Sequence, residues 1–395
     1  GIRDVAVTGV QTCALPICTN GAQNNTFIDS STANAGTGWP ITRNGNTTQG
    51  TFTPFSQPDG WWSNYFDGSS RLNVAQTTPF NFGTGAFTVE CWIYRPATSS
   101  GGAYNCVLGG HDGSSSTWGM YVYQNTNIPS FYVNGTLYSS SIAVPDNAWT
   151  HLAAVRDGSG NFALYVNGTL GVSASNSGSI TVGSGGLYIG RDAAINAYYI
   201  GYISNIRIIK GQSAYSANFT PSAYPLTTTS QGITAANVSL LTCQSNYFKD
   251  NSTNAYSVTV ANGTPSVQNF YPFFPPLDYS TAAIGGSGYF DGSGDYLSSS
   301  ISAIGTGDFT VEFYAYGGNF SQGGFFQISG TSGGLSTSYS GGCLAYINSG
   351  NLGVFVDTNF ISTTYTLVKY QWFHVAIVRQ SGTVSIYANG VLEIG

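Results

Sequence analysis

The chain contains one long internal repeat. Three phrases recur about 220 residues apart: YFDGS begins at Tyr65 and again at Tyr289, GTG followed by FTVE begins at Gly83 and at Gly305, and a tryptophan-led apolar phrase begins at Trp149 and at Trp372. A repeat of this length is far longer than the unit of a solenoid, but it suits an all-β sandwich or barrel that folds as one domain. The 395-residue chain is therefore predicted to contain one domain written twice.

The repeat also suggests where each domain lies. We expect copy 1, with a lead-in strand, at residues 18–226, a polar linker at residues 227–238, and copy 2 at residues 239–395. Copy 2 ends without a counterpart of residues 174–226, so it is expected to be truncated at its C-terminus. The phrase VTGVQTCALPI, at residues 7–17, matches no part of copy 2 and corresponds codon for codon to a common sequencing adapter, so residues 1–17 are set apart; the alternative is a genuine apolar lead-in strand. We interpret this segment as translated adapter rather than native protein.

The composition excludes several classes of protein. Charged residues make up 7 % of the chain, against about a quarter in ordinary soluble domains, while aromatic residues make up 14 %. Disordered chains are poor in aromatic residues, so the low charge does not indicate disorder. The net charge is −6 and no basic run occurs, so no nucleic-acid partner is expected. No apolar run approaches the roughly 18 residues of a membrane span.

Local patterns predict strands and hairpins. The segment Trp149–Arg156 is apolar on both faces, which is typical of a strand covered on both sides. The pairs Asn134-Gly135 and Asn167-Gly168 favour type I′ hairpin turns between alternating strands. No segment has an apolar period of 3.6 residues over more than two turns. These features predict an all-β fold, an antiparallel two-sheet sandwich in two tandem copies.

Six phrases in order carry a resemblance to a known family: YFDGSSRL, FTVECWIY, WTHLAAVR, LYVNGTL, LYIGRD and GYISNIRIIKGQSAYSANFTPSAYPL. Together they resemble laminin G-like domains of the concanavalin A-like lectin and glucanase superfamily, in the versions found along tailed-phage structural proteins and bacterial surface proteins. The resemblance implies a jelly-roll sandwich within a larger multidomain chain, located on a virion surface, outside the cell or at the cell surface. It leaves the function open, because members bind sugars, calcium or proteins, or serve only as structure.

Catalytic chemistry finds little support in the sequence. A retaining glycosidase needs two carboxylates about 5 to 5.5 Å apart. Glu90, Glu312 and Glu393 each lack a second acid at the i+2 or i+4 position. We interpret Glu90 as an outward strand residue that pairs with a neighbour, and His151 as a satisfied core or sheet histidine. Cys91 is interpreted as a core thiol. The chain is therefore expected not to be an enzyme, with a glycoside hydrolase as a distant alternative.

Two groups of residues are candidates for ligand binding. The resemblance implies that Asp112 and Asp192, which follow the strand phrases CVLGG and LYIG, lie at one rim of the sandwich and bind calcium there. The alternative is that both are turn formers. In copy 2 the phrase GTSGG, at residues 330–334, replaces Asp112. The second group consists of aromatic residues in or near loops, which are expected to stack on sugar rings. The alternative is that they pack in the core or against the linker. They are Trp61, Trp62, Trp118, Tyr198, Tyr199 and Tyr202.

The first functional hypothesis is a non-catalytic carbohydrate-binding or adhesion module of a virion or cell-surface protein. Its partner would be a glycan or a host-surface polysaccharide, and tandem copies would raise avidity. The alternative is a purely structural spacer domain of a phage tail or surface fibre. A glycan-binding screen separates the two hypotheses, because a spacer binds no glycan.

Overall fold

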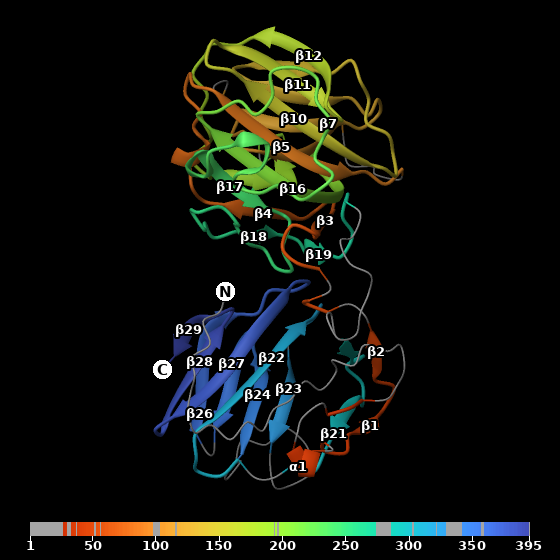
Figure 1. Ribbon diagram of the computed structural model, residues 1–395, viewed down its shortest axis with the longest axis vertical. Helices are drawn as coiled ribbons and strands as arrows, with labels where there is room; N and C mark the ends of the chain where they lie inside the picture. Colours follow the sequence, from red (N-terminus) through yellow and green to blue (C-terminus); the bar gives the residue numbers. More distant parts are fainter. Residues whose placement is uncertain are drawn as a thin grey trace. The chain divides into compact units, whose positions relative to one another are not determined.

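The structure is a computed structural model (Figure 1). It describes residues 27–29, 33–36, 38–50, 53–55, 57–97, 103–114, 117–192, 194–195, 197–273, 286–301, 304–320, 322–328, 342–356 and 359–394. The predicted adapter segment and the GTSGG phrase lie outside these residues. The chain forms two compact units, one from residues 57–276 and one from residues 1–56 together with 277–395. Described strands dominate both units, which confirms the all-β prediction.

The unit of residues 57–276 is a sandwich of two antiparallel sheets. The larger sheet consists of β3 (Ser63–Asp67), β5 (Phe87–Tyr94), β10 (Trp149–Arg156), β11 (Asn161–Val166), β12 (Thr169–Ser175), β16 (Ile200–Lys210), β17 (Val238–Thr242) and β19 (Ser266–Gln268). The smaller sheet consists of β4 (Arg71–Val74), β6 (Tyr104–Gly109), β7 (Trp118–Tyr123), β8 (Pro129–Val133), β9 (Thr136–Ser139), β13 (Leu187–Ile189) and β18 (Thr259–Asn262).

Short elements connect these sheets. They are a two-stranded ladder of β14 (Arg191–Asp192) and β15 (Ala197–Tyr198) and the 3₁₀ turns η1 (Thr78–Phe80), η2 (Ser230–Gly232) and η3 (Ala235–Asn237). Both predicted hairpin turns are present, since Asn134 and Asn167 have positive φ of 50° and 48° and each is followed by a glycine of positive φ. The β10 strand is buried from Thr150 to Arg156, as its apolar faces predicted.

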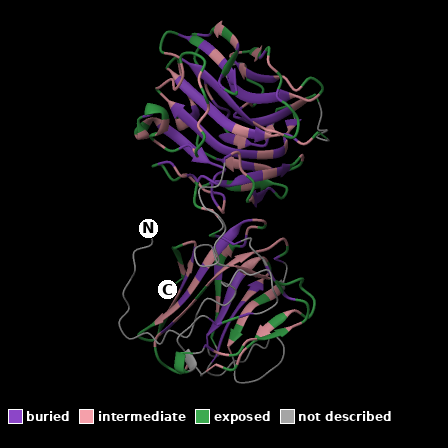
Figure 2. Cartoon of the chain, turned by 45° about the vertical axis from the view of Figure 1, so that its right-hand side comes forward, coloured by how far each residue is buried: buried purple, intermediate pink, exposed green. Residues whose placement is uncertain are grey.

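The core of this sandwich lies between its two sheets, and its strands are buried over most of their length (Figure 2). Alternate residues of β5 point into it, so that Val89, Cys91 and Ile93 are at most 1 % exposed. The Cys91 sulfur lies 3.8 Å from the Met120 sulfur of β7. Burial raises the pKa of the Cys91 thiol well above its usual value. The prediction of a core thiol is confirmed.

The second unit is also built mainly of antiparallel strands. Its elements are α1 (Ala33–Gly36), β1 (Thr42–Asn44), β2 (Thr48–Gly50), β20 (Ser287–Tyr289), β21 (Tyr296–Ser298), β22 (Phe309–Tyr316), β23 (Gln322–Ile328), β24 (Cys343–Asn348), β25 (Asn351–Val356), β26 (Asn359–Thr366), β27 (Trp372–Gln380), β28 (Thr383–Ala388) and β29 (Val391–Ile394). Two four-stranded sheets, β22-β27-β28-β29 and β23-β24-β25-β26, enclose its core. Among the described strands, β22 pairs only with β27, whereas its counterpart β5 is flanked by both β10 and β16.

Strand pairing groups the chain differently from the predicted boundaries. Strand β17, which spans the predicted junction at residues 238–239, pairs with β16 of copy 1, and β18 and β19 pair with β4 and β3. The residues assigned to the lead-in of copy 2 therefore complete the copy 1 sandwich. The physical reason is that β17 is buried throughout and supplies the apolar residues and backbone groups that the β16 edge requires.

Candidate binding site

The candidate site lies on the outer face of the larger sheet of residues 57–276. Because side chains alternate along a strand, Trp92 points away from the core that holds Cys91 and Ile93. In the sheet, Trp92 is flanked by His151 of β10 and by Ser204 of β16. The fold thus places one large aromatic side chain near the centre of the eight-stranded sheet.

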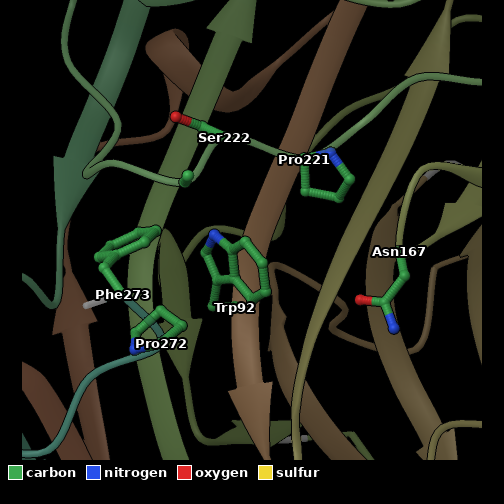
Figure 3. Close-up of a pocket in the computed structure, with 7 residues that line it drawn as sticks. Trp92, Asn167, Pro221, Ser222, Pro272 and Phe273 are labelled. Atoms are coloured by element: carbon green, nitrogen blue, oxygen red, sulfur yellow. The ribbon is translucent and has the colours of Figure 1, made fainter.

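Loops build walls around this indole ring (Figure 3). The resulting cavity has a volume of about 290 Å³ and is lined by Trp92, Asn167, Pro221, Ser222, Ala223, Pro272 and Phe273. The lining is mainly apolar, with one amide and one hydroxyl group among it. Ligand pockets usually have about 300–1,000 Å³ and a mainly apolar lining with a few polar groups, so this cavity lies at the small end of that class.

The walls are held by specific hydrogen bonds. Asn167 lies in the turn between β11 and β12, and its side-chain Oδ1 accepts a hydrogen bond from the His151 backbone N–H at 2.8 Å. The next residue, Gly168, accepts a backbone hydrogen bond from Phe219 at 2.9 Å. A Cβ on Gly168 would lie 1.8 Å from the Phe219 oxygen, so only glycine permits this close approach. The turn therefore anchors the segment that carries Pro221 and Ser222.

Aromatic packing orients Trp92. Its ring meets Phe273 edge to face, with centroids 5.7 Å apart, and lies 5.2 Å from the His151 ring. The Trp92 Nε1 atom is buried and has no hydrogen-bond acceptor among the described residues. Buried donors are normally paired with protein or water, so this N–H is a group that an ordered water or a ligand oxygen would satisfy.

A row of aromatic side chains continues along the same face of the sheet. Tyr65, Tyr202, Tyr94 and Trp149 lie opposite one another on four neighbouring strands. Their neighbouring ring centroids are 4.9 Å apart for Tyr65 and Tyr202, 5.8 Å for Tyr202 and Tyr94, and 5.7 Å for Tyr94 and Trp149. Phe270 packs against the last three and remains 37 % exposed. This aromatic row forms a broad apolar surface next to the cavity.

Beside the cavity lies a buried carboxylate. Glu90 is 0 % exposed and accepts hydrogen bonds from Arg207 Nε at 2.8 Å and from the Tyr215 hydroxyl at 2.8 Å. His151 Nε2 lies 3.2 Å from the same carboxylate. Burial by itself would raise the pKa of Glu90, but the Arg207 charge and the hydrogen bonds lower it to about 2. An ionised, fully bonded carboxylate does not donate protons at neutral pH.

The interpretation of Glu90 was therefore correct about pairing and wrong about exposure. Segment 211–226 covers this face, and its Tyr215 closes over the carboxylate. The counterpart Glu312 in the second unit lies 3.3 Å from His374, and its side chain is 62 % exposed. His151 is a buried sheet histidine, as predicted, although its Nδ1 has no partner among the described residues.

Most of the residues predicted to bind sugars are not exposed. Trp61, Trp62, Trp118 and Tyr199 are between 0 % and 6 % exposed, which corrects the expectation that they lie free in or near loops. Trp118 faces the core from β7, where its Nε1 donates to the Phe80 carbonyl at 3.0 Å. The Tyr199 hydroxyl donates to the Tyr94 carbonyl at 3.1 Å. These side chains stabilise the sandwich and offer no surface to a ligand.

The other two predicted residues are half-buried. Tyr198 packs under the Arg191 guanidinium, 4.6 Å from its ring centroid. Tyr202 is a member of the aromatic row. The structure therefore brings Tyr202 close to other aromatic residues of the outer face. A sugar-binding role for Tyr198 and Tyr202 remains a prediction.

The predicted calcium residues have other partners. Both oxygens of the buried Asp192 accept hydrogen bonds: Oδ2 faces His111 Nδ1 at 2.9 Å and the Tyr121 hydroxyl, and Oδ1 accepts from the Ala194 N–H at 2.7 Å. Burial would raise the pKa of Asp192, but the His111 and Tyr121 hydrogen bonds lower it. Asp112 is exposed and accepts from the Ser114 N–H at 3.0 Å, as turn-forming Asp residues do. No cluster of three metal-ligating side chains occurs in the described part of the chain.

Calcium binding by Asp112 and Asp192 thus remains a prediction. It is tested by comparing the stability of variants in the presence and absence of calcium, because the loss of a hydrogen bond lowers stability in both conditions. Asp192→Asn is expected to lower stability by about 1–3 kcal/mol in chelator, because a buried acceptor is lost. Thermal unfolding with chelator and with millimolar calcium measures both effects. A calcium-dependent rise of the wild-type midpoint that Asp112→Ala and Asp192→Asn each remove would support the calcium site. An unchanged wild-type midpoint would refute it.

Sequence reasoning missed the cavity residues Trp92, Asn167 and Phe273. Trp92 was noted only as part of a strand phrase, and Asn167 only as a turn former. The available signal was alternation: in FTVECWIY the apolar core residues take one face, so Trp92 must lie on the other. Phe273 lies more than 100 residues from both, and no local pattern places it beside them.

The fold and the site define a β-sandwich protein with an aromatic cavity on its outer sheet face. The laminin G model of the concanavalin A-like lectin/glucanases superfamily matches residues 66–217 and 291–394, more than half of the chain. The protein therefore belongs to this superfamily, which confirms the resemblance seen in the sequence. No curated protein is significantly similar to the chain.

Several solved structures are similar to parts of the chain. A Bacteroides ovatus protein with a provisional assignment as carbohydrate-binding is 16 % identical, with a TM-score of 0.38, over 53 % of this chain and 60 % of its own. The heptameric SAP-like pentraxin of Limulus polyphemus is 18 % identical, with a TM-score of 0.35, over 53 % of this chain and 96 % of its own. Domains LG4-5 of mouse laminin alpha1 are 13 % identical, with a TM-score of 0.30, over 83 % of this chain and 76 % of their own. These similarities are too distant to indicate a ligand.

The only α-helix in the described residues has four residues, so none of the described helices is able to cross a membrane.

Proposed function

We propose that the protein is a non-catalytic carbohydrate-binding module that binds glycans at the Trp92 cavity and the adjoining aromatic row. The observation that carries the proposal is an indole ring on the floor of a cavity of about 290 Å³ whose rim holds the Asn167 amide and the Ser222 hydroxyl. The C–H face of a pyranose is apolar and fits an aromatic ring, whereas its hydroxyl groups need polar partners at the edge. Membership of a lectin-containing superfamily is consistent with this assignment.

The absence of catalysis is part of the proposal. Glu90, the carboxylate nearest to the cavity in the β5 strand, is held ionised by Arg207 and is covered by Tyr215. It is therefore suited to stabilising the fold and poorly suited to acting as a general acid. A hydrolase assay on the glycans that bind would test this part of the proposal, and turnover would contradict it.

We further propose that the module acts on a virion or cell surface, within an adhesion protein or fibre. Low charge, a partly exposed aromatic row and tandem copies suit repeated weak contacts with a polysaccharide, where linked sites raise the effective concentration. Labelling of intact particles or cells with an antibody against the protein measures the location. Labelling that requires lysis would contradict it.

Replacement of Trp92 is the direct test of the binding site. Trp92→Ala is expected to weaken glycan binding at least about tenfold, equivalent to about 1.4 kcal/mol. The measurement is binding to an array of bacterial and eukaryotic glycans, followed by titration calorimetry with the best binder. Tyr296→Ala is the control, because Tyr296 is 56 % exposed and lies in the second unit, outside the cavity lining.

Two outcomes would contradict the proposed site. Equal binding by wild type and Trp92→Ala, with both proteins folded, would move the site elsewhere. No binding to any glycan would favour the structural spacer. Thermal unfolding of each variant shows whether the effect of Trp92→Ala comes from lost contact or from lost folding.

A further inference from the structure

Two hairpins in the chain have the same docking chemistry. One consists of β1 and β2 on either side of Asn44-Gly45, and the other of β18 and β19 on either side of Asn262-Gly263. The two strands of each are joined by a turn but pair with other strands and not with each other. We call them the donor hairpins. The strand pairs on which they dock, β20–β21 and β3–β4 respectively, are called the acceptors.

Each donor hairpin docks on the same region of the repeat. Asn44 pairs with Tyr296 and Thr48 with Tyr289 in one unit. Asn262 pairs with Arg71 and Ser266 with Tyr65 in the other. Tyr289 and Tyr65 are the same position of the YFDGS repeat. The two docking arrangements are therefore equivalent in position but not in every pair, because a bulge between Val260 and Asn262 shifts the register of β18 on β4 and β1 pairs with β21 without one.

The turns repeat the same polar contact. The Thr264 N–H donates to Ser70 Oγ at 2.9 Å, and the Asn46 N–H donates to Asp295 Oδ1 at 2.6 Å. Gly263 and Gly45 have φ of 66° and 69°. A Cβ on Gly263 would lie 2.7 Å from the Ser70 Cα, and a Cβ on Gly45 would lie 3.0 Å from the Asp295 Cα. Both donor hairpins thus need glycine for the same close approach.

The segments after the hairpins also dock alike. Phe273 meets Trp92 of β5 edge to face at 5.7 Å, and Phe55 meets Tyr314 of β22 edge to face at 5.0 Å. Trp92 and Tyr314 occupy one position of the FTVE repeat. Each donor segment therefore supplies a phenyl ring to the outer face of the sheet that it completes.

Neither donor hairpin docks on the acceptor that follows it in the chain. The hairpin at residues 42–50 precedes the acceptor at 63–74 but docks at 287–298, and the hairpin at 259–268 precedes the acceptor at 287–298 but docks at 63–74. Each hairpin therefore docks on its acceptor through surface contacts, since no short loop connects the two in the chain. Exchange of such an element between copies uses contacts that the fold already makes, which makes it a low-cost route to association.

We propose that the β1–β2 donor hairpin of one copy of the chain docks on the β20–β21 acceptor of a second copy, so that the protein links to itself by exchanged hairpins. The partner is a second copy of this chain, because it presents the same β20–β21 acceptor on which this hairpin docks within one chain. Docking within one chain competes with docking between chains, and the balance shifts to linked copies as the protein concentration rises.

A cysteine pair divided between two chains tests the exchange. Thr42 and Ser298 are directly paired and both exposed, and paired antiparallel residues lie at a distance that a disulfide can span. Full-length chains carrying Thr42→Cys and Ser298→Cys, each with Cys13 and Cys18 replaced by serine, are unfolded together, refolded at high concentration and oxidised mildly. A covalent heterodimer is expected, increasing with concentration.

Three controls make the result decisive. Leu392→Cys replaces Ser298→Cys as an exposed cysteine outside the acceptor, since Leu392 is 54 % exposed in β29, and it should give little heterodimer. Adding Gly45→Val to the Thr42→Cys chain should abolish the heterodimer. One chain with both cysteines should close an internal disulfide at low concentration. An internal disulfide without any heterodimer would overturn the proposed exchange. The same holds if the Leu392→Cys chain gives as much heterodimer as the Ser298→Cys chain. If the internal disulfide fails to form, the docking of the hairpin within one chain is itself wrong.

Discussion

A fragment of residues 57–276 is expected to fold into a stable sandwich, whereas a fragment of residues 57–226 is expected to be unfolded at room temperature. The shorter fragment keeps every strand of the predicted copy 1 from β3 onward but lacks β17, β18 and β19. Among the buried side chains that it thereby loses, four aliphatic ones are at most 2 % exposed: Val238, Leu240, Leu241 and Val267.

The size of this effect follows from burial. Each buried aliphatic side chain contributes about 1.5–3 kcal/mol, so the four together contribute about 6–12 kcal/mol. Domains are usually stable by about 5–15 kcal/mol in total. The loss also leaves β16 and β3 with unpaired backbone groups along one edge.

The measurement is thermal and urea unfolding followed by circular dichroism. A peptide of residues 238–276 added to the shorter fragment should restore the sandwich, which separates missing strands from general damage by truncation. Equal melting temperatures of the two fragments would show that the lead-in of copy 2 contributes nothing to copy 1.

The second large effect is expected from Arg207→Met, which should destabilise the 57–276 sandwich by about 3–5 kcal/mol because it leaves the Glu90 carboxylate buried without its charge partner. Arg207 is 0 % exposed, and its guanidinium also donates to Thr227 O and to Ser230. Urea unfolding of the fragment 57–276 measures the free energy of unfolding. The double variant Glu90→Gln with Arg207→Met should recover part of the loss, since no buried charge remains.

The same ion pair predicts a dependence on pH. The pKa of Glu90 is lowered from 4.5 to about 2, so its contribution to stability is fully present above about pH 4.5 and is lost as the pH falls through about 2. Wild type should therefore lose more stability over this range than Glu90→Gln. Glu312→Gln is the matched control in the second unit, where the 62 % exposed carboxylate should change stability by less than about 0.5 kcal/mol. A parallel pH profile of wild type and Glu90→Gln would contradict the role assigned to Arg207.

Much of the fold was predictable because it depends on local patterns. Alternation in FTVECWIY placed Cys91 in the core, and the Asn-Gly pairs at 134–135 and 167–168 specified hairpin turns with positive φ. The repeat itself required that both halves adopt one kind of sandwich. Burial and turn type at these positions depend on only a few neighbouring residues, so they are predictable from the sequence.

The site was only partly predictable, because exposure depends on what covers a residue. Trp118 follows the polar run SSST and Tyr199 lies between two strands, yet both side chains are buried. Glu90 lies on the outer face of β5, yet Tyr215, 125 residues later, covers it. The cavity joins residues 92, 167, 221–223 and 272–273, which no window of the sequence contains together.

By itself, the sequence determined that the protein consists of repeated antiparallel sandwiches with defined strands and turns, since hydrophobic period and turn chemistry are local properties. Only the tertiary structure decided which hairpin completes which sandwich. The physical reason is that both donor hairpins carry the same Asn-Gly turn and both acceptors the same YFDGS phrase, so the sequence allows either pairing. Long-range strand pairing decides which hairpin completes which sandwich. The same pairing places Phe273 beside Trp92, where it forms one wall of the cavity.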